Sequence, residues 1–205
     1  WDGEDGTSRK LSYQELSEEV CKLANYLKSQ NVNVGDSVGI YMPMVPEVVI
    51  AMFACMKIGA VVVPVFSAFG AEALAVRLAD AKAKVLITAD GGFRRGKKFP
   101  IKTQANQALS LVASIQRVIV YQHAKLDVFF DNDRDVWWHD AIATQSTSCA
   151  TAKLPSEARA LILYTSGTTG KPKGTVHTHA GCLATIGKEL AYAFDVKADS
   201  KFFWF

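Results

Sequence analysis

Runs of apolar and β-branched residues alternate with stretches of helical periodicity along most of this chain, and this alternation restricts the fold more than any other feature. Strands are expected at residues 37–42, 61–65, 84–88, 117–121, 159–164 and 201–205, and helices at residues 12–27, 46–59, 71–81, 104–114 and 180–194. Alternating strands and helices build parallel βαβ units with right-handed crossovers. We therefore expect an α/β fold with a mostly parallel sheet, in which ligands bind at the carboxyl ends of the strands.

Two of the expected helices begin with specific signals. Ser12 and Glu15 have the spacing of a capping box, in which each side chain accepts a hydrogen bond from the backbone N–H of the other residue. Pro46 suits the first turn of the next helix, where its missing N–H costs nothing. The alternation weakens over residues 122–157, which are polar and irregular.

The composition argues against several kinds of function. With 205 residues, of which 49% are hydrophobic, the chain can bury one sizeable core. The net charge is +3 and the basic residues are scattered, so a nucleic-acid partner is not expected. No apolar run is long enough to span a membrane. Four cysteines without a CxxC pair favour a reducing compartment, either the cytoplasm or the mitochondrial matrix.

A loop rich in glycine, hydroxyl groups and lysine directly follows the strand expected at 159–164. It consists of Thr165, Ser166, Gly167, Thr168, Thr169, Gly170, Lys171, Pro172, Lys173 and Gly174. Glycines let backbone N–H groups approach a ligand, hydroxyls add rotatable donors, and the two lysines add positive charge. Such a loop can hold a polyphosphate. The alternative is a solvated, flexible linker, which the flanking apolar strand disfavours.

This loop is not a P-loop of the Walker A type. That motif has a glycine five residues before its Gly-Lys pair and a Ser or Thr after the pair. Here Thr165 stands at the first of these positions and Pro172 at the second. Proline lacks an N–H donor and prevents a helix from opening onto the phosphates. A kinase or P-loop ATPase is therefore disfavoured.

The string YTSGTTGKPKG at residues 164–174 closely resembles the phosphate loop of the adenylate-forming superfamily of AMP-dependent synthetases and ligases. The resemblance implies that residues 165–173 handle the β- and γ-phosphates of ATP while a carboxylate attacks the α-phosphorus. An acyl-adenylate and pyrophosphate would result, and Mg²⁺ would accompany ATP. The residue types agree, because preorganised donors and cations are what neutralise charge on a triphosphate.

A second loop that is rich in glycine and basic residues, at 90–97, is expected after the strand at 84–88. It is similar to the segment of acetyl-CoA synthetase-like enzymes that holds the CoA nucleotide, which implies CoA-binding roles for Arg94, Arg95, Gly96 and Lys97. The stretches WDGEDGTSRKLSY, YMPMVPE and KIGAVVVPVFSAFG resemble the same branch. Lys97 departs from the arginine common there, and lysine lacks the bidentate phosphate geometry of arginine. A basic surface turn is the alternative.

Two groups of side chains suggest metal sites only superficially. His177 and His179 could share a metal on a strand, but no third ligand is near them in the sequence. An acidic cluster lacks the glycine and the closing glutamate of a calcium loop; it comprises Asp127, Asp131, Asp133 and Asp135. We expect packed histidines, a solvated acidic surface loop, and no metal bound by these residues.

Taken with the resemblance, residues 1–205 are expected to be part of a large N-terminal adenylation domain, without the C-terminal subdomain. The chain starts at Trp1 and ends in aromatic residues, whereas termini are normally solvated, so we expect a piece of a longer protein without catalytic residues of its own. The parent would be an acyl-CoA synthetase that activates a short- or medium-chain carboxylic acid with ATP and transfers the acyl group to CoA. A non-catalytic nucleotide- or phosphate-binding module, or a degenerate paralogue, is the alternative.

Overall fold

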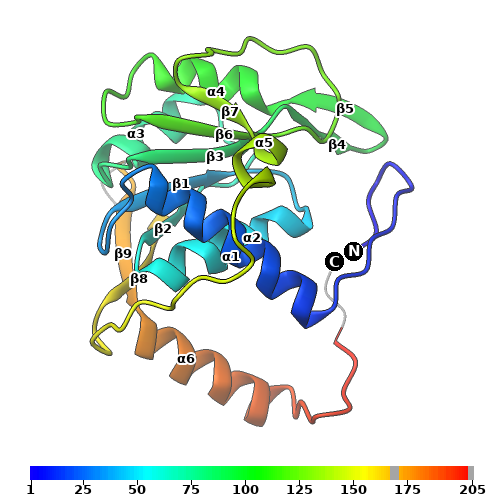
Figure 1. The fold of residues 1–205 in the computed structure, drawn as a ribbon, viewed down its shortest axis with the longest axis vertical. Helices are drawn as coiled ribbons and strands as arrows, with labels where there is room; N and C mark the ends of the chain where they lie inside the picture. Colours follow the sequence, from blue (N-terminus) through cyan, green and yellow to red (C-terminus); the bar gives the residue numbers. More distant parts are fainter. Residues whose placement is uncertain (167–170, 203–205) are drawn as a thin grey trace.

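The computed structural model describes residues 1–166 and 171–202. Within them, a seven-stranded sheet has the order β7-β6-β3-β1-β2-β8-β9 (Figure 1). The strands of this sheet are β1 (Ser37–Tyr41), β2 (Val61–Pro64), β3 (Val85–Ala89), β6 (Arg117–Tyr121), β7 (Asp135–Trp137), β8 (Arg159–Thr165) and β9 (Lys173–Thr178). Neighbouring strands run parallel, except for the antiparallel pair β8 and β9. The expected α/β fold with a mostly parallel sheet is confirmed.

Helices cover both faces of the sheet. The covering helices are α1 (Tyr13–Ser29), α2 (Pro46–Ile58), α3 (Ala71–Asp80), α4 (Ile101–Leu109) and α5 (Trp138–Ala143); a sixth helix, α6 (His179–Lys188), follows β9. One buried cluster joins α1, α2 and α5 to the sheet, and a second joins α3 and α4 to its other face (Figure 1). The result is three layers with two apolar interfaces.

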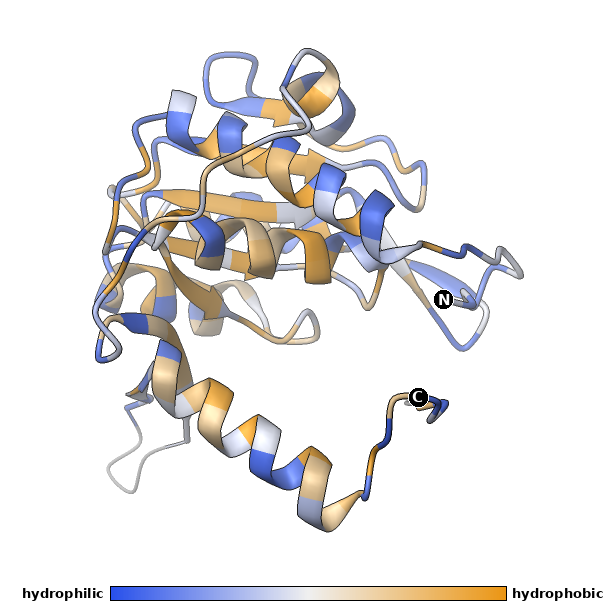
Figure 2. Cartoon of the chain, turned by 60° about the horizontal axis from the view of Figure 1, so that its bottom comes forward, coloured by the Kyte–Doolittle hydropathy of each residue, from blue (hydrophilic) through white to orange (hydrophobic). Residues whose placement is uncertain are grey.

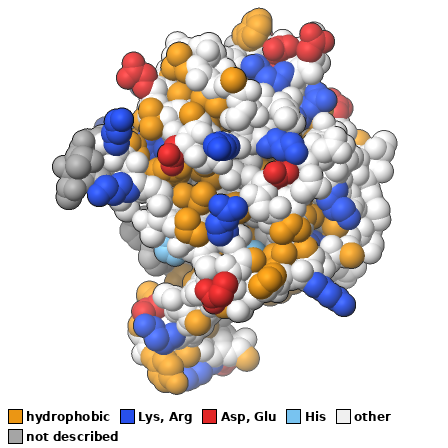
Figure 3. All heavy atoms as spheres, turned by 90° about the vertical axis from the view of Figure 1, so that its left-hand side faces the viewer, with side chains coloured by type: hydrophobic (Ala, Val, Ile, Leu, Met, Phe, Trp, Pro, Cys, Tyr) orange, Lys and Arg blue, Asp and Glu red, His pale blue; other side chains and the backbone are white. Residues whose placement is uncertain are grey.

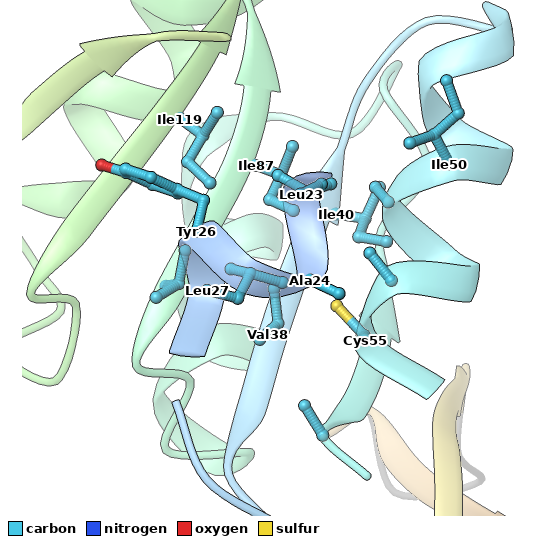
Figure 4. Close-up of a cluster of buried hydrophobic side chains, with 14 of the residues drawn as sticks. Leu23, Ala24, Tyr26, Leu27, Val38, Ile40, Ile50, Cys55, Ile87 and Ile119 are labelled. Atoms are coloured by element: carbon cyan, nitrogen blue, oxygen red, sulfur yellow. The ribbon is translucent and has the colours of Figure 1, made fainter. Parts of the chain in front are cut away.

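The two apolar interfaces follow from the alternation of side chains along each strand. In β3, Val85 and Ile87 belong to the first cluster, whereas Leu86 belongs to the second. Figure 4 shows Ile87 beside Leu23 of α1 in the first cluster. Because both faces are covered, the central strands β1 and β3 are buried along their whole length, as is typical of parallel sheets.

The local helix signals are confirmed. Ser12 caps α1: its hydroxyl accepts from the Glu15 N–H, and the Glu15 carboxylate accepts from the Ser12 N–H at 2.7 Å. Pro46 is the first residue of α2, which ends at Ile58 with Gly59 as its C-cap. Both helices lie where the sequence places them, because caps and apolar spacing act over only a few residues.

The region 122–157 is more ordered than the sequence suggests, since it contributes β7 and α5. Lys102 of α4 forms an ion pair with Asp135 at 2.6 Å, and both side chains are fully buried. The expectation of a solvated acidic loop is therefore wrong for Asp135, although Asp127 and Asp133 are exposed. The pairing partner lies 33 positions earlier in the chain, which a local pattern cannot reveal.

The last described segment differs from the rest. Residues 173–178 form β9, so a strand and not a continuing loop leads into α6, and α6 continues into the π-helical turn η1 (Glu189–Ala193). No residue of α6 is buried, and Figure 2 shows this helix lying apart from the layers. Lys201 and Phe202 are not in a strand, and the rest of the strand expected at 201–205 lies outside the described residues.

Candidate functional site

The expected phosphate loop connects the antiparallel strands β8 and β9. Thr165, the last residue of β8, pairs with Lys173, the first residue of β9, so residues 166–172 form the connection. The structure describes the ends of this loop. Gly167, Thr168, Thr169 and Gly170, which the sequence also assigns to phosphate binding, lie outside the described residues.

The described ends of the loop present free positive charge beside hydroxyl groups. Thr165, Ser166, Lys171 and Lys173 are all exposed. Neither lysine forms an ion pair with any residue of the described chain. A strand, and not a helix, follows Pro172, in keeping with the distinction from a Walker A loop. Uncompensated lysines next to hydroxyl donors form a surface suited to an anion with several charges.

The base of this hairpin is held against α3. Tyr164 of β8 donates its hydroxyl proton to Oδ2 of Asp80 at 2.6 Å, and Arg77 lies 5.8 Å from the centre of the Tyr164 ring. Burial and then the bond to Asp80 raise the pKa of the Tyr164 phenol, which keeps it protonated as a donor. The sequence motif includes Tyr164, but nothing in the motif points to a partner 84 positions away.

The expected second loop is in fact a β-hairpin. Strands β4 (Gly91–Arg94) and β5 (Lys97–Pro100) pair in antiparallel register, with Arg94 opposite Lys97. Arg95 and Gly96 make the turn with φ values of 52° and 73°, which matches the two positive φ values of a tight hairpin turn. The sequence misses the strands because each has only four residues and no apolar alternation.

Three basic side chains at the tip of this hairpin remain without acidic partners. Arg94, Arg95 and Lys97 are exposed, and none of them forms an ion pair within the described ranges. Lys98 lies over the ring of Phe93 at 5.9 Å. The tip is therefore a concentrated patch of positive charge, as an anion-binding role requires.

Asp90 holds the hairpin in place, whereas the sequence predicts for it only a position at the start of the loop at 90–97. Its buried carboxylate accepts backbone N–H groups from Gly91, His123, Ala124 and Leu126, at 2.7 to 3.0 Å. These bonds join the start of β4 to the segment after β6. The available signal is the pair Asp90-Gly91 directly after a buried strand, because aspartate in turns commonly accepts backbone donors.

Among the residues that the structure describes, the two predicted groups of site residues do not come together. The hairpin β4–β5 leaves from the carboxyl end of β3. The end of β8 lies beside Asp80, the last residue of α3, and α3 leads into the amino end of β3. The basic hairpin and the described ends of the phosphate loop thus lie toward opposite ends of β3 (Figure 1).

A cavity of about 1050 Å³ lies beside the hairpin but contains none of the predicted site residues. It is lined by the N-terminal segment, the turn after β1, Phe93 and His123. Trp1 donates from Nε1 to the carbonyl of Met44 at 2.8 Å, and Arg9 pairs with the buried Glu47. These contacts hold the N-terminal segment on the turn. The sequence contains no local signal for this cavity.

The histidines and acidic residues do not assemble into a metal site in the described structure. Among residues 1–166 and 171–202, no group of three or more His, Cys, Asp or Glu side chains could hold an ion. His177 lies opposite Leu161 in the β8–β9 pair, and His179 begins α6. In the same ranges, no helix has the length and apolar character needed to cross a membrane.

Comparison with known proteins agrees with this architecture. A family model described as AMP-binding enzyme matches residues 3–205. The chain is 46% identical over 202 residues to an acetyl-coenzyme A synthetase of Shewanella frigidimarina, covering 97% of the chain. It is 45% identical over 204 residues to an acetyl-coenzyme A synthetase of Streptomyces coelicolor, covering the whole chain.

A solved structure supports the fold independently. The acetoacetyl-CoA synthetase from Streptomyces lividans superposes with a TM-score of 0.89 at 27% sequence identity, over 96% of this chain and 30% of the other. The chain spans 31% of the length of the two acetyl-coenzyme A synthetases.

Proposed function

Because this chain belongs to the AMP-binding enzyme family, we propose that it forms part of the large N-terminal domain of an ATP-dependent acyl-CoA synthetase. The observation that carries the proposal is the β8–β9 connection, where Lys171 and Lys173 stand uncompensated beside Thr165 and Ser166. The full-length protein would join a short- or medium-chain carboxylic acid to AMP and then transfer the acyl group to CoA. The names of the similar synthetases support this reaction class.

The chemistry explains why such a loop is needed. A carboxylate is a poor acyl donor because its oxygen does not leave, and joining it to AMP supplies a leaving group. The carboxylate oxygen attacks the α-phosphorus, and the bond from that phosphorus to the bridging oxygen of pyrophosphate breaks. The loop would hold the β- and γ-phosphates with its lysines, hydroxyl groups and backbone N–H groups, and so stabilise charge on the departing pyrophosphate.

We assign Mg²⁺ to the bound nucleotide. Two lysines do not neutralise a triphosphate, and the described residues offer no acidic cluster that would hold the ion by itself. The ion would therefore arrive with ATP, and the loop residues would orient the phosphates that carry it.

The basic β4–β5 hairpin is our candidate for the CoA site. Arg94, Arg95 and Lys97 carry unpaired positive charge on a rigid two-stranded support, with Gly96 completing the turn. Phosphate groups of CoA would bind there during the thioester step. The separation of this hairpin from the phosphate loop supports a division of labour between the two half-reactions.

We further propose a cytoplasmic location, with the mitochondrial matrix as the alternative. All four cysteines are free thiols, and Cys21 and Cys55 are buried among apolar side chains, in keeping with a reducing compartment. The competing function is a nucleotide-binding module without catalysis. Carboxylate-dependent ATP–pyrophosphate exchange by the full-length protein, measured across a panel of acids, separates the two; no exchange with any acid would favour the module.

Replacing Lys173 by alanine in the full-length protein tests the role of the loop. A preorganised cation at a phosphoryl centre contributes roughly 2–4 kcal/mol, so kcat for pyrophosphate exchange should fall about 10²–10³-fold. The KM for the acid should change little. The thioester step, assayed with preformed acyl-adenylate, should be largely spared because pyrophosphate has already left. Lys188→Ala, an exposed lysine of α6 outside the loop, is the matched control. An equal loss in both half-reactions would contradict the phosphate role.

The double variant Arg94→Ala/Lys97→Ala tests the hairpin. We expect a raised KM for CoA with pyrophosphate exchange near the parent rate, because the hairpin lies away from the phosphate loop. If exchange falls as far as thioester formation, the hairpin serves the fold and does not bind CoA.

A further inference from the structure

The link between the phosphate loop and the rest of the fold is narrow. β8 pairs with β2 at one position, Val62 with Leu161, whereas it pairs with β9 along its length. The half of β8 nearest the loop therefore has no ladder partner in the body of the sheet. Tyr164 supplies a hydrogen bond there, from its hydroxyl to Asp80 at 2.6 Å. This length is typical of a hydroxyl bound to a charged carboxylate.

Asp80 is a firm anchor because the helix that carries it is firmly packed. Arg77, one turn earlier in α3, is buried; it donates to the carbonyl of Ala73 at 2.6 Å and lies 4.5 Å from the centre of the Phe69 ring. At the other end of α3, Gln104 of α4 accepts from the N–H of Ala71. The last turns of α3 are thus tied to the loop before the helix, and its first residue is tied to a neighbouring helix.

The position of Asp80 is unfavourable for the helix alone. A negative side chain at the last turn opposes the helix macrodipole, which favours cations there. The carboxylate at residue 80 therefore does not stabilise the helix itself. Its role in the fold is to accept the hydrogen bond from the Tyr164 hydroxyl.

Tyr164 also fixes the opposite strand of the hairpin. It faces Gly174 across the β8–β9 ladder, and a Cβ atom at Gly174 would lie 3.2 Å from Cε1 of Tyr164 and 2.9 Å from Cγ2 of Ile162. The Tyr164 ring and Ile162 together occupy the space that a side chain at 174 would need. Tyr164 therefore contacts both strands at the base of the loop, immediately before the pair Thr165 and Lys173.

We propose that Tyr164 is a positioning residue for adenylation: its hydroxyl bond to Asp80 fixes the β8–β9 hairpin on α3 and so sets where the loop holds the triphosphate. The inference rests on the proposed phosphate role of this loop. Tyr164 itself would not touch the reacting atoms. The protonated phenol remains a donor because burial and Asp80 both raise its pKa.

The test uses Tyr164→Phe in the full-length protein, which removes the hydroxyl and keeps the ring on Gly174. Pyrophosphate exchange should slow about tenfold, the order expected for losing one hydrogen bond to a charged group, with the KM for the acid within about twofold. The thioester step from preformed acyl-adenylate should stay near the parent rate. Asp80→Ala, at an exposed position, should give the same split, and the double variant should be no slower than either single variant.

Tyr41→Phe is the matched control, because it removes another tyrosine hydroxyl bond of 2.6 Å, to the carbonyl of Phe69 inside the body. It should lower Tm without changing the ratio of the two half-reactions. If Tyr164→Phe behaves like Tyr41→Phe, or slows both half-reactions equally, Tyr164 is only structural. If Lys173→Ala slows exchange and Tyr164→Phe does not, the positioning role is wrong while the phosphate role stands. If Lys173→Ala has no effect, the proposed phosphate role of the loop is wrong, and the positioning role of Tyr164, which depends on it, is wrong as well.

Discussion

Helices α1 and α6 have similar N-terminal caps but pack in very different surroundings. Ser12 caps α1 by accepting from the Glu15 N–H, and Thr178 caps α6 by accepting from the Gly181 N–H. α1 buries six residues against the sheet, whereas α6 buries none. Figure 3 shows the α6 segment projecting from the body with hydrophobic side chains on its surface; Leu183 is 77% exposed and Ile186 57%.

The difference shows that capping and apolar spacing are enough to define a helix but not to stabilise it. Most of the stability of a helix in a protein comes from packing of its apolar face. The layers built from residues 13–143 have that packing in the described structure, and the β9–α6 segment does not. The phosphate loop lies between the two regions, which explains why one contact from Tyr164 can matter for its position.

The largest expected difference between the packed layers and the β9–α6 segment concerns ion pairs. Lys102→Met leaves Asp135 as a buried charge without its lysine partner, although Arg134 still contacts it, so the free energy of unfolding should drop by about 3–5 kcal/mol in urea denaturation. Lys188→Met, which removes an exposed lysine paired with Glu189 at 3.2 Å, should cost under about 1 kcal/mol. The double variant Lys102→Met/Asp135→Leu should recover much of the loss. Equal effects at Lys102 and Lys188 would refute the contrast between the regions.

A pair of leucine truncations tests packing directly. Leu23 of α1 is fully buried, so Leu23→Ala should cost about 2–5 kcal/mol through lost burial and a cavity. Leu183→Ala in α6 should change the free energy of unfolding by no more than about 0.5 kcal/mol, because its side chain is mostly in solvent. Thermal and urea unfolding of both variants provide the measurement. A cost above about 2 kcal/mol at Leu183 would mean that another surface covers α6.

The smallest expected difference between the two regions concerns the N-terminal caps of α1 and α6. Ser12→Ala should lower global stability by about 1 kcal/mol, because α1 unfolds together with the layers that it packs against. Thr178→Ala should loosen α6 locally and leave the global midpoint almost unchanged. Amide hydrogen exchange distinguishes these outcomes: the first change should speed exchange across the core, and the second only in α6. A shift of the global midpoint by Thr178→Ala would show that α6 folds as part of the core.

Much of the fold could be predicted because its signals are local. The cap at Ser12, the proline at the start of α2 and the runs of β-branched residues all act within a few positions, so α1, α2, α3 and the central strands appear where they are expected. The helix expected at 104–114 lies instead at Ile101–Leu109, and the sequence does not predict α5. The string at 164–174 likewise carried the family resemblance by itself, and the family match over residues 3–205 agrees with it. The roles of the individual loop and hairpin residues remain predictions.

What the sequence could not determine are the contacts between distant segments. Lys102 forms a buried ion pair with Asp135, the Asp90 carboxylate accepts from the backbone of His123, Ala124 and Leu126, and the Tyr164 hydroxyl donates to Asp80. In each of these contacts the partners lie 33 to 84 positions apart. Such partners depend on the strand order β7-β6-β3-β1-β2-β8-β9. This order arises from how the layers pack, and no short stretch of sequence specifies it. Sequence thus determined which elements form and what chemistry the loop can offer. Tertiary structure alone decided that the basic hairpin and the described ends of the phosphate loop lie toward opposite ends of β3, because strand order and crossovers set the place of every loop at once.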